Sequence, residues 1–340
     1  MEATLGARGT TTQQATPPQP RATARKQIAA VAAAGGALVL LVGTQTESAF
    51  IKAIGTTGHQ LEWISDVIAS VMVASLTYLW LHLRVTRAEL LTSERARIAQ
   101  DEQLRLAAEI QRTLLPEIPR ETPRYRWAAR METAHQVGGD FYDFVTAGDG
   151  AVLLILGDVS GKGMPAAMMQ SSLATLFRVH ASMTADPGAI ASRMSRALFD
   201  QTGGNPYATA ILARFDQSPP RMTYVNAGHP AGLVLRRAGM LQLDSGGPPL
   251  GLLPGASYES ASIDLGPDDA GFLVTDGVTE ALEGISLPLS QAIESGRRRP
   301  AATPQEDCDY LLGLAAGSSG PPGSEAWSDD RTVLAFRVSD

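Results

Sequence analysis

Aspartates that stand beside glycines, or at the ends of apolar runs, are the residues of this chain best suited to chemistry. They occur in the segments VGGDFYD, LLILGDVSGKG, FLVTDG and SDDRT, and they are Asp140, Asp158, Asp276, Asp329 and Asp330. A carboxylate at the end of a strand is held by rigid backbone, and a neighbouring glycine lets main chain and ligand come close. Carboxylates that converge from distant segments repel one another unless a cation binds between them. Oxygen ligands of this kind favour Mg²⁺ or Mn²⁺.

Each aspartate taken alone is better explained as a turn residue, because Asp-Gly is a common turn pair. The combination favours a ligand set, since Asp158 and Asp276 end strongly apolar runs and the pair Asp329 and Asp330 opens another. The chain has a single cysteine, Cys308, which excludes zinc sites built from several cysteines. Cys308 lies outside every motif, and we assign it no role.

Two other side chains in these motifs, Lys162 and His229, are better explained by structural roles than by catalysis. GDVSGKG superficially resembles a phosphate-binding P-loop, which requires Gly six residues before the Lys and Ser or Thr directly after it. Leu156 and Gly163 occupy those positions around Lys162, so the P-loop is absent. Lys162 could attract a substrate phosphate, but a solvated loop lysine is favoured. His229, in NAGHP, could act as an acid, but a hydrogen-bonded turn histidine is favoured.

The elements that must position the aspartates begin at residue 125. Short apolar runs typical of β-strands occur at 125–131, 151–156, 208–215, 221–225, 232–236, 240–243, 271–275 and 331–338. Helical patterns occur at 164–182, 188–201, 287–295 and 305–315. Strands in groups, with helices in pairs between them, indicate an α+β fold rather than alternating βαβ units.

The first 83 residues predict a disordered tail followed by a membrane anchor. Residues 1–27 are polar, Pro-rich and too poor in large apolar groups to fold. Apolar runs at 28–43 and 67–83 favour a two-helix transmembrane hairpin, although the first is short for a bilayer span. Basic residues flank the pair on its outer sides, and the positive-inside rule then places both termini and the C-terminal part in the cytoplasm. The alternative, a signal peptide at 28–43, lacks a clear cleavage site.

Residues 84–115 are rich in Arg, Glu, Ala and Leu and contain no Gly or Pro, which predicts a linker helix that carries a signal. The apolar residues of this segment form a partial stripe that suits a short coiled coil and hence a homodimer. A solvated connector helix is equally consistent with the pattern. Pro116 and Pro119 end the helix. The segment has no histidine, which excludes the phospho-accepting histidine of a sensor kinase.

Composition excludes several classes of protein. The chain has 340 residues, 44% of them hydrophobic, which is enough for a folded core. It carries 28 Lys and Arg against 35 Asp and Glu, for a formal charge of -7. An acidic balance argues against nucleic-acid binding, which needs a basic face to meet phosphates.

The ordered motifs carry a family resemblance. Eight motifs, in this order along the chain, resemble the SpoIIE/RsbU-like branch of the metal-dependent (PPM-type) Ser/Thr protein phosphatases. They are EIQRTLLP, GGDFYDF, GDVSGKGMPAAM, YATAILARFD, YVNAGHP, PPLGL, LVTDGVTEA and DDRTVLAFRV. The resemblance covers roughly residues 105–340 and implies an αββα sandwich phosphatase domain at 120–340 with a site for two Mn²⁺ or Mg²⁺ ions. Two such ions, about 3.5–4 Å apart, activate a water molecule that attacks phosphorus, so no serine or cysteine nucleophile is needed.

The resemblance also implies a ligand set, carried over residue by residue: Asp140, Asp158, the backbone carbonyl of Val159, Asp276 and one of the pair Asp329 and Asp330. Asp158 matches the carboxylate that bridges both metals, Asp140 the ligand on the second, and Asp276 a ligand on the first. Within the pair, Asp329 is favoured because the family's ligand is the first residue of this doublet, and Asp330 is the fallback.

We therefore expect a membrane-tethered phosphatase that hydrolyses phospho-Ser or phospho-Thr on a cytoplasmic regulator. By resemblance, the substrate is an anti-sigma-factor antagonist of the STAS type. The alternative is a non-catalytic phosphoprotein-binding module of the same fold, which the loss of an acidic ligand would favour; no ligand is lost. One departure is the segment after Ala281, which is shorter than in the family and puts the outer helical layer and the substrate-facing edge in doubt.

Overall fold

The computed structural model describes residues 59–119, 122–244, 246–297, 303–317, 327 and 329–339. The described residues fall in two units, which divide between Ala99 and Gln100. The predicted disordered tail (1–27) and the first predicted span (28–43) lie outside the described residues.

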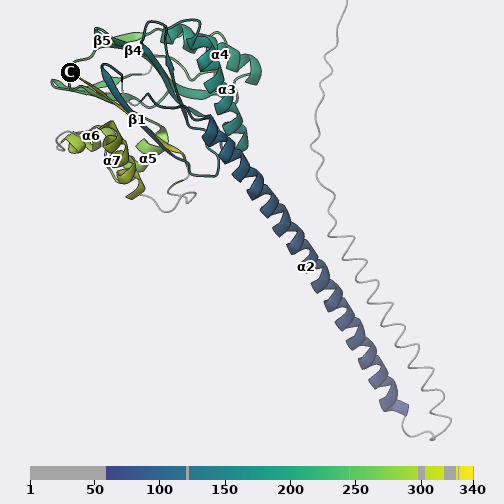
Figure 1. Ribbon diagram of the computed structural model, residues 1–340. Helices are drawn as coiled ribbons and strands as arrows, with labels where there is room; N and C mark the ends of the chain where they lie inside the picture. Colours follow the sequence, from purple (N-terminus) through teal and green to yellow (C-terminus); the bar gives the residue numbers. More distant parts are fainter. Residues whose placement is uncertain are drawn as a thin grey trace, which may run out of the picture. The chain divides into compact units, whose positions relative to one another are not determined.

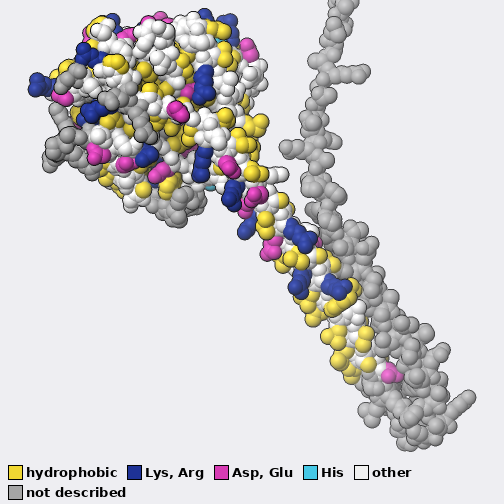
Figure 2. All heavy atoms as spheres, in the orientation of Figure 1, with side chains coloured by type: hydrophobic (Ala, Val, Ile, Leu, Met, Phe, Trp, Pro, Cys, Tyr) yellow, Lys and Arg dark blue, Asp and Glu magenta, His cyan; other side chains and the backbone are white. Residues whose placement is uncertain are grey.

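The first described element is one long helix, α2 (His59–Leu114). It contains the second predicted span (67–83) and nearly all of the predicted linker (84–115), so these are parts of one helix rather than two elements. No Gly or Pro interrupts the helix, and Pro116 follows its end. Apolar side chains gather on its first half and charged side chains along its second half (Figure 2). From Asp66 onward it is the one helix in the described chain that is long and apolar enough to cross a membrane.

Two five-stranded sheets, in which every pairing is antiparallel, form the centre of the second unit. The first sheet has the order β1-β10-β9-β6-β7 and the second the order β2-β3-β4-β5-β8. The strands of the first sheet are β1 (Tyr125–Glu132), β6 (Gly232–Arg236), β7 (Gly239–Leu243), β9 (Ala270–Val274) and β10 (Arg331–Val338). Those of the second are β2 (Phe141–Thr146), β3 (Val152–Val159), β4 (Ala208–Gln217), β5 (Pro220–Ala227) and β8 (Ala261–Asp264).

The two sheets pack face to face through side chains that alternate along their strands. Trp127 and Phe336 of the first sheet meet Phe215 of the second, with ring centroids 4.6 Å and 4.8 Å from that of Phe215. Tyr125 packs edge-on against the same phenylalanine and donates its hydroxyl hydrogen to the backbone oxygen of Asp216. Buried aromatic side chains contribute large apolar areas, so this cluster holds the two sheets in a fixed relation.

Helices cover the outer face of each sheet (Figure 1). α3 (Met164–Ala181) and α4 (Pro187–Thr202) pack on the second sheet. α5 (Asp276–Gly284), α6 (Leu289–Arg297) and α7 (Pro304–Gly317) share a buried apolar cluster with the first sheet. The order of layers is helix, sheet, sheet, helix, which confirms the predicted αββα sandwich. The outer helical layer placed in doubt by the short segment after Ala281 is present.

All eight predicted strands and all four predicted helices of this unit occur, with ends shifted by a few residues. Three elements were missed. β2 lies inside the motif GGDFYDF, where an acidic residue interrupts the apolar pattern, and β8 is a short, mostly exposed strand without an apolar run. α5 begins with Asp276-Gly277, which resembles a turn, so Asp276 is the first residue of a helix rather than the end of a strand.

Candidate functional site

The strand order brings the predicted aspartates to one end of both sheets. Asp140 directly precedes β2, and Asp158 is the penultimate residue of the neighbouring strand β3. In the other sheet, Asp276 follows β9, and Asp329 and Asp330 directly precede β10, its neighbour. Because neighbouring strands run antiparallel, the end of β3 meets the start of β2 and the end of β9 meets the start of β10. Four segments that are distant in sequence therefore meet in one place.

The carboxylates are close enough to affect one another's charge. Burial raises the pKa of Asp158 to about 8, and the negative charges of Asp276, Asp329 and Asp330 add to the rise. Burial likewise raises the pKa of Asp140 well above its usual range, with further contributions from Asp158 and Asp330. A set of acidic groups that resist ionisation together is the environment that a divalent cation would stabilise.

Asp140 joins the two sheets. Its Oδ2 accepts hydrogen bonds from Thr275 Oγ1 at 2.8 Å and from Thr332 Oγ1 at 2.5 Å, and both threonines belong to the opposite sheet's β9–α5 and β10 segments. Its Oδ1 is buried and has no hydrogen-bond partner among the described residues. A buried carboxylate oxygen without a donor is costly, and a cation is the group that would complete it.

The two adjacent aspartates have different surroundings. The carboxylate of Asp330 accepts hydrogen bonds from the backbone nitrogens of Ala134 (2.9 Å) and Gly139 (2.7 Å), so both of its oxygens are engaged by the chain. Asp329 is more exposed, and its Oδ2 lies 3.1 Å from Lys162 Nζ. Asp330 therefore fastens the loop before β2, while Asp329 pairs with Lys162 and accepts the backbone N–H of Asp330 at 3.0 Å.

Glycines are needed where these segments approach most closely. A Cβ on Gly139 would lie 2.9 Å from Asp158 Oδ1 and 3.0 Å from the Val159 carbonyl oxygen. A Cβ on Gly138 would overlap the Asp330 carboxylate, and one on Gly277 would overlap the Asp330 backbone oxygen. The glycines of the GGD and TDG motifs thus leave the space in which the acidic segments converge.

Gln111, near the end of α2, contacts the same loop. Its Nε2 donates to the Gly138 carbonyl oxygen at 2.8 Å and to Gln170 Oε1 of α3 at 3.0 Å, while its Oε1 accepts from the Gly138 backbone nitrogen at 3.3 Å. The motif EIQRTLLP contains Gln111, but the sequence alone assigns this residue no role. The available signal was a polar side chain on the half-buried face of the helix that also carries Leu104, Ala107 and Ala108.

The remaining candidates are placed as follows. His229 is buried and its Nδ1 lies 2.9 Å from Thr209 Oγ1, which agrees with the hydrogen-bonded interpretation. Burial lowers the pKa of His229 to about 3, so the ring is neutral at physiological pH. Cys308 is buried in the cluster between α7 and the first sheet, and burial raises the pKa of its thiol to about 12. Neither residue offers a reactive group to a substrate.

A small pocket opens at the acidic end of the sandwich. It is lined by His135, Val137, Gly139, Gly161, Lys162, Gly163, Asp329 and Asp330. In the described part of the chain, no group of three or more His, Cys, Asp or Glu side chains is drawn together closely enough to hold a metal ion as it stands. A full ligand set there requires carboxylates that now pair with the chain, such as Asp329, to turn toward the ion.

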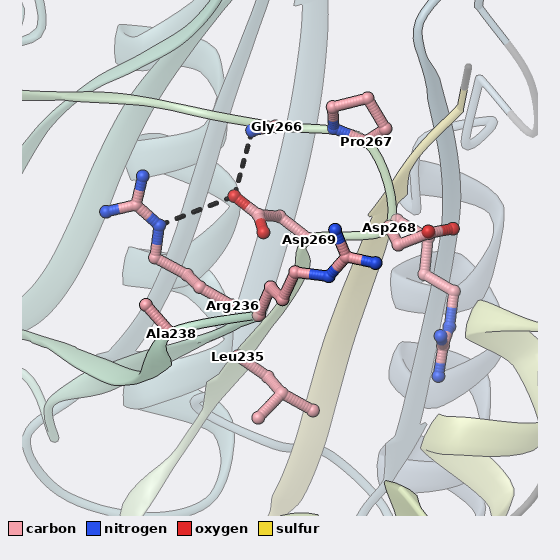
Figure 3. Close-up of a pocket in the computed structure, with 9 residues that line it drawn as sticks. Leu235, Arg236, Ala238, Gly266, Pro267, Asp268 and Asp269 are labelled. Carbon is pink, nitrogen blue, oxygen red and sulfur yellow. Dashed lines mark hydrogen bonds and ion pairs between the residues drawn. The ribbon is translucent and has the colours of Figure 1, made fainter.

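A larger pocket, of about 720 Å³, lies at the opposite ends of β9 and β10. It is lined by Leu235, Arg236, Arg237, Ala238, Gly266, Pro267, Asp268, Asp269 and Arg337. Asp269 accepts a hydrogen bond from the Gly266 backbone nitrogen at 2.9 Å, and its Oδ2 lies 3.4 Å from Arg236 Nε (Figure 3). None of the predicted site residues lines this pocket, so its size does not mark the functional site.

The sandwich and the acidic end define a PP2C-type phosphatase fold, and solved structures agree. The SiaA-PP2C domain of Pseudomonas aeruginosa superposes with a TM-score of 0.57 at 20% identity, over 71% of this chain and 98% of that one. The RsbU and RsbW domains of Rv1364c from Mycobacterium tuberculosis give a TM-score of 0.53 at 28% identity, over 64% of this chain and 62% of that one.

The family follows from the sequence match. The family model of Stage II sporulation protein E (SpoIIE) matches residues 148–339, more than half of the chain, so the chain belongs to the SpoIIE family. Phosphoserine phosphatase RsbP of Bacillus subtilis is 29% identical over 150 residues, which are 43% of this chain and 37% of that protein. The chain spans less than half the length of the curated relatives that it matches. The predicted resemblance is confirmed at the level of the family.

Proposed function

We propose that this chain is a metal-dependent protein phosphatase that removes phosphate from Ser or Thr. The observation that carries the proposal is the convergence of acidic segments from both sheets, where burial and mutual repulsion raise the pKa of Asp140, Asp158 and Asp276. Membership in the SpoIIE family and similarity to a protein named a phosphoserine phosphatase support the activity.

The oxygen donors at this end of the sandwich have the chemistry that suits divalent cations, and Asp329 would have to turn from Lys162 toward the ions to complete a ligand set. We assign as ligands Asp140, Asp158, the Val159 carbonyl, Asp276 and Asp329. Asp140 Oδ1 is a buried oxygen that lacks a donor among the described residues, and Gly139 keeps space open against Asp158 and the Val159 carbonyl. Asp330, whose oxygens both accept backbone hydrogen bonds, is assigned to fastening the loop. Carboxylate and carbonyl oxygens suit Mn²⁺ or Mg²⁺, which supply a Lewis acid and an activated water when bound.

In this reaction, the role of the protein chain is to hold the acidic side chains in fixed orientations. Asp158 projects from a central strand whose partners on both sides are hydrogen-bonded along its length. Thr275 and Thr332 donate to one oxygen of Asp140 and leave the other for coordination. Ligands positioned by rigid strands and by neighbouring hydroxyl groups lose little entropy when an ion binds, which favours tight and specific binding.

The metal requirement gives a direct test. The full chain, purified in detergent and stripped with a chelator, should fail to hydrolyse a phosphoserine peptide, and added Mn²⁺ or Mg²⁺ should restore turnover. Calorimetry should detect two divalent ions per chain. The alternative function, a non-catalytic phosphoprotein-binding module, predicts that the peptide binds but is not hydrolysed at any metal concentration. That outcome would replace the proposed activity.

We further propose that the substrate is a phosphorylated anti-sigma-factor antagonist of the STAS type. Two observations on other proteins support this: the relative RsbP is named a phosphoserine phosphatase, and the similar Mycobacterium tuberculosis protein combines RsbU and RsbW domains in one structure. Partner-switching regulators of sigma factors are therefore the class of protein in which to seek the substrate.

Membrane tethering and signal transmission are proposed from α2. Its apolar first half suits a membrane span, and with the predicted span at 28–43 it would form a hairpin that leaves both termini and the phosphatase unit in the cytoplasm. Exposed leucines and isoleucines along its second half, among them Leu91, Ile98 and Leu106, suit a coiled-coil homodimer. The contact of Gln111 with the loop before Asp140 gives such a helix a route to the site.

Removal of the Gln111 amide should weaken the metal site without unfolding it. Gln111→Ala loses the hydrogen bonds that hold Gly138, two residues before Asp140, and we expect the Mn²⁺ concentration for half-maximal activity to rise about tenfold, as for other groups that orient metal ligands. The matched control is Gln103→Ala, an exposed glutamine of the same helix, which should behave like the unaltered chain. Equal metal dependence of the two variants would contradict the route through Gln111.

A further inference from the structure

Lys162 is unusual in this chain. The sequence contains three lysines, and Lys162 is the last of them. All other residues with a positively charged Lys or Arg side chain after Lys52 are arginines. It lies between β3 and α3, flanked by Gly161 (φ 104°) and Gly163 (φ 75°). A Cβ at either glycine would meet no atom within 4 Å, so open space lies beside the backbone on both sides of Lys162.

The ammonium group of Lys162 meets the acidic end of the sandwich. Its Nζ lies 3.1 Å from Asp329 Oδ2, and its side chain is about half exposed (48%). Burial and the charge of Asp329 raise the pKa of Asp276, and the positive charge of Lys162 opposes that rise. Lys162 opposes a similar rise at Glu280, which burial and Asp276 cause. The solvated loop lysine expected from the sequence is thus a counter-ion for the acidic cluster.

The geometry points to Lys162 as a displaceable cation that occupies Asp329 until a divalent ion takes its place, after which the released ammonium binds the phosphate group of the substrate. This inference rests on the proposed function. Asp329 Oδ1 already accepts the backbone N–H of Asp330 at 3.0 Å, so the oxygen left for an ion is Oδ2, where the positive charge of Lys162 opposes a second cation. Lysine suits the exchange, because its single ammonium group on a flexible side chain leaves a carboxylate more easily than an arginine that binds in a bidentate manner.

The position of Lys162 also suits phosphate. Lys162 and Asp329 line the same small pocket, so an ammonium group that leaves Asp329 remains at the mouth of the site. A phosphoserine brings a charge of about −2 and three acceptor oxygens, which form strong charge-assisted hydrogen bonds with an ammonium group. One lysine would then lower the metal affinity of the resting site and raise its affinity for substrate.

The substitution Lys162→Met, in the full chain purified in detergent, tests both the competition with metal and the binding of phosphate. Methionine keeps the length of the side chain and removes its charge. Calorimetry should show that Mn²⁺ binds about two- to fivefold more tightly than in the unaltered chain, the range expected for loss of a half-exposed ion pair. Inhibition by inorganic phosphate should weaken about fivefold or more, and KM for a phosphoserine peptide should rise more than kcat falls. Lys162→Arg keeps the charge and should bind Mn²⁺ less tightly than the Met variant.

The matched control is Arg237→Met, which removes one exposed positive charge at the opposite end of the sheet and should change neither constant. Circular dichroism confirms folding of each variant, and Lys162→Gln repeats the test with a polar side chain. The unaltered chain should bind Mn²⁺ and turn over substrate. If it does so and Lys162→Met has the same Mn²⁺ affinity and the same phosphate inhibition, the role of Lys162 is wrong while the proposed function stands. If the unaltered chain binds no Mn²⁺, the proposed function is overturned with it.

Discussion

Asp158→Asn is expected to abolish turnover while the fold survives. The substitution keeps the size of the side chain but removes the charge that would hold the cations, and its loss would remove several kcal/mol of transition-state stabilisation. The rate with a phosphoserine peptide and saturating Mn²⁺ should fall at least about a thousandfold. Asp264→Asn is the matched control, because Asp264 is an exposed carboxylate at a sheet edge, paired with Arg221, and should keep full activity.

The same variant should show opposite effects on stability and activity. Asp158 has a pKa of about 8 in the folded chain, above its value in an unfolded chain, so ionisation of this group opposes folding in the absence of metal. Folding then takes up a proton, and the penalty grows as pH rises from about 4 towards 8. Asn carries no charge and avoids the penalty.

Thermal unfolding in a chelator therefore distinguishes a metal-binding carboxylate from a purely structural one. Asp158→Asn should unfold at the same or a higher temperature than the unaltered chain, and its advantage should widen with pH. Added Mn²⁺ should stabilise the unaltered chain and leave the variant unchanged. Activity that persists in the Asn variant, or a variant that unfolds far below the unaltered chain at neutral pH, would contradict the role given to Asp158.

The sequence was sufficient for the parts of this fold that rest on local patterns. Strands such as β3 and β10 contain apolar runs, VLLIL and VLAF, and Asp158 and the pair Asp329 and Asp330 stand close to the ends of these runs. The aspartates are recognisable because each stands where an apolar run stops. The grouping of strands with helices in pairs indicated an α+β fold, and the arrangement in two packed sheets came only from the family resemblance that the ordered motifs carry.

Contacts between distant segments were not predictable in the same way. Thr275 and Thr332 support Asp140 across the interface between the sheets, and nothing in the local sequence marks either threonine as its partner. The different surroundings of Asp329 and Asp330 also appear only in three dimensions, because the backbone donors to Asp330 come from Ala134 and Gly139. A one-dimensional pattern shows which side chains are unusual but not what they contact.

Gly277→Ala is expected to disrupt the site through the backbone rather than through charge. A Cβ at this second residue of α5 would overlap the backbone oxygen of Asp330 and lie 3.3 Å from that of Asp329. Neither oxygen can turn aside as a side chain would, because β10 begins at the next residue and is paired on both sides. The segment that carries Asp329 must then shift away from Asp276, which should cost about 1–3 kcal/mol of stability and reduce kcat/KM about a hundredfold.

The control lies in the same helix. Gly284, at the end of α5, has no atom within 4 Å of the position of a Cβ, so Gly284→Ala should be tolerated and can stabilise the helix, because alanine has the higher helix propensity. The pair is compared by urea unfolding and by Mn²⁺-dependent hydrolysis of a phosphoserine peptide. Because the two substitutions are chemically identical, only the crowding around Gly277 separates them. Equal stability and equal activity of both variants would show that the Asp329–Asp330 segment is not held where α5 meets β10, and the placement of Asp329 as a ligand would fail with it.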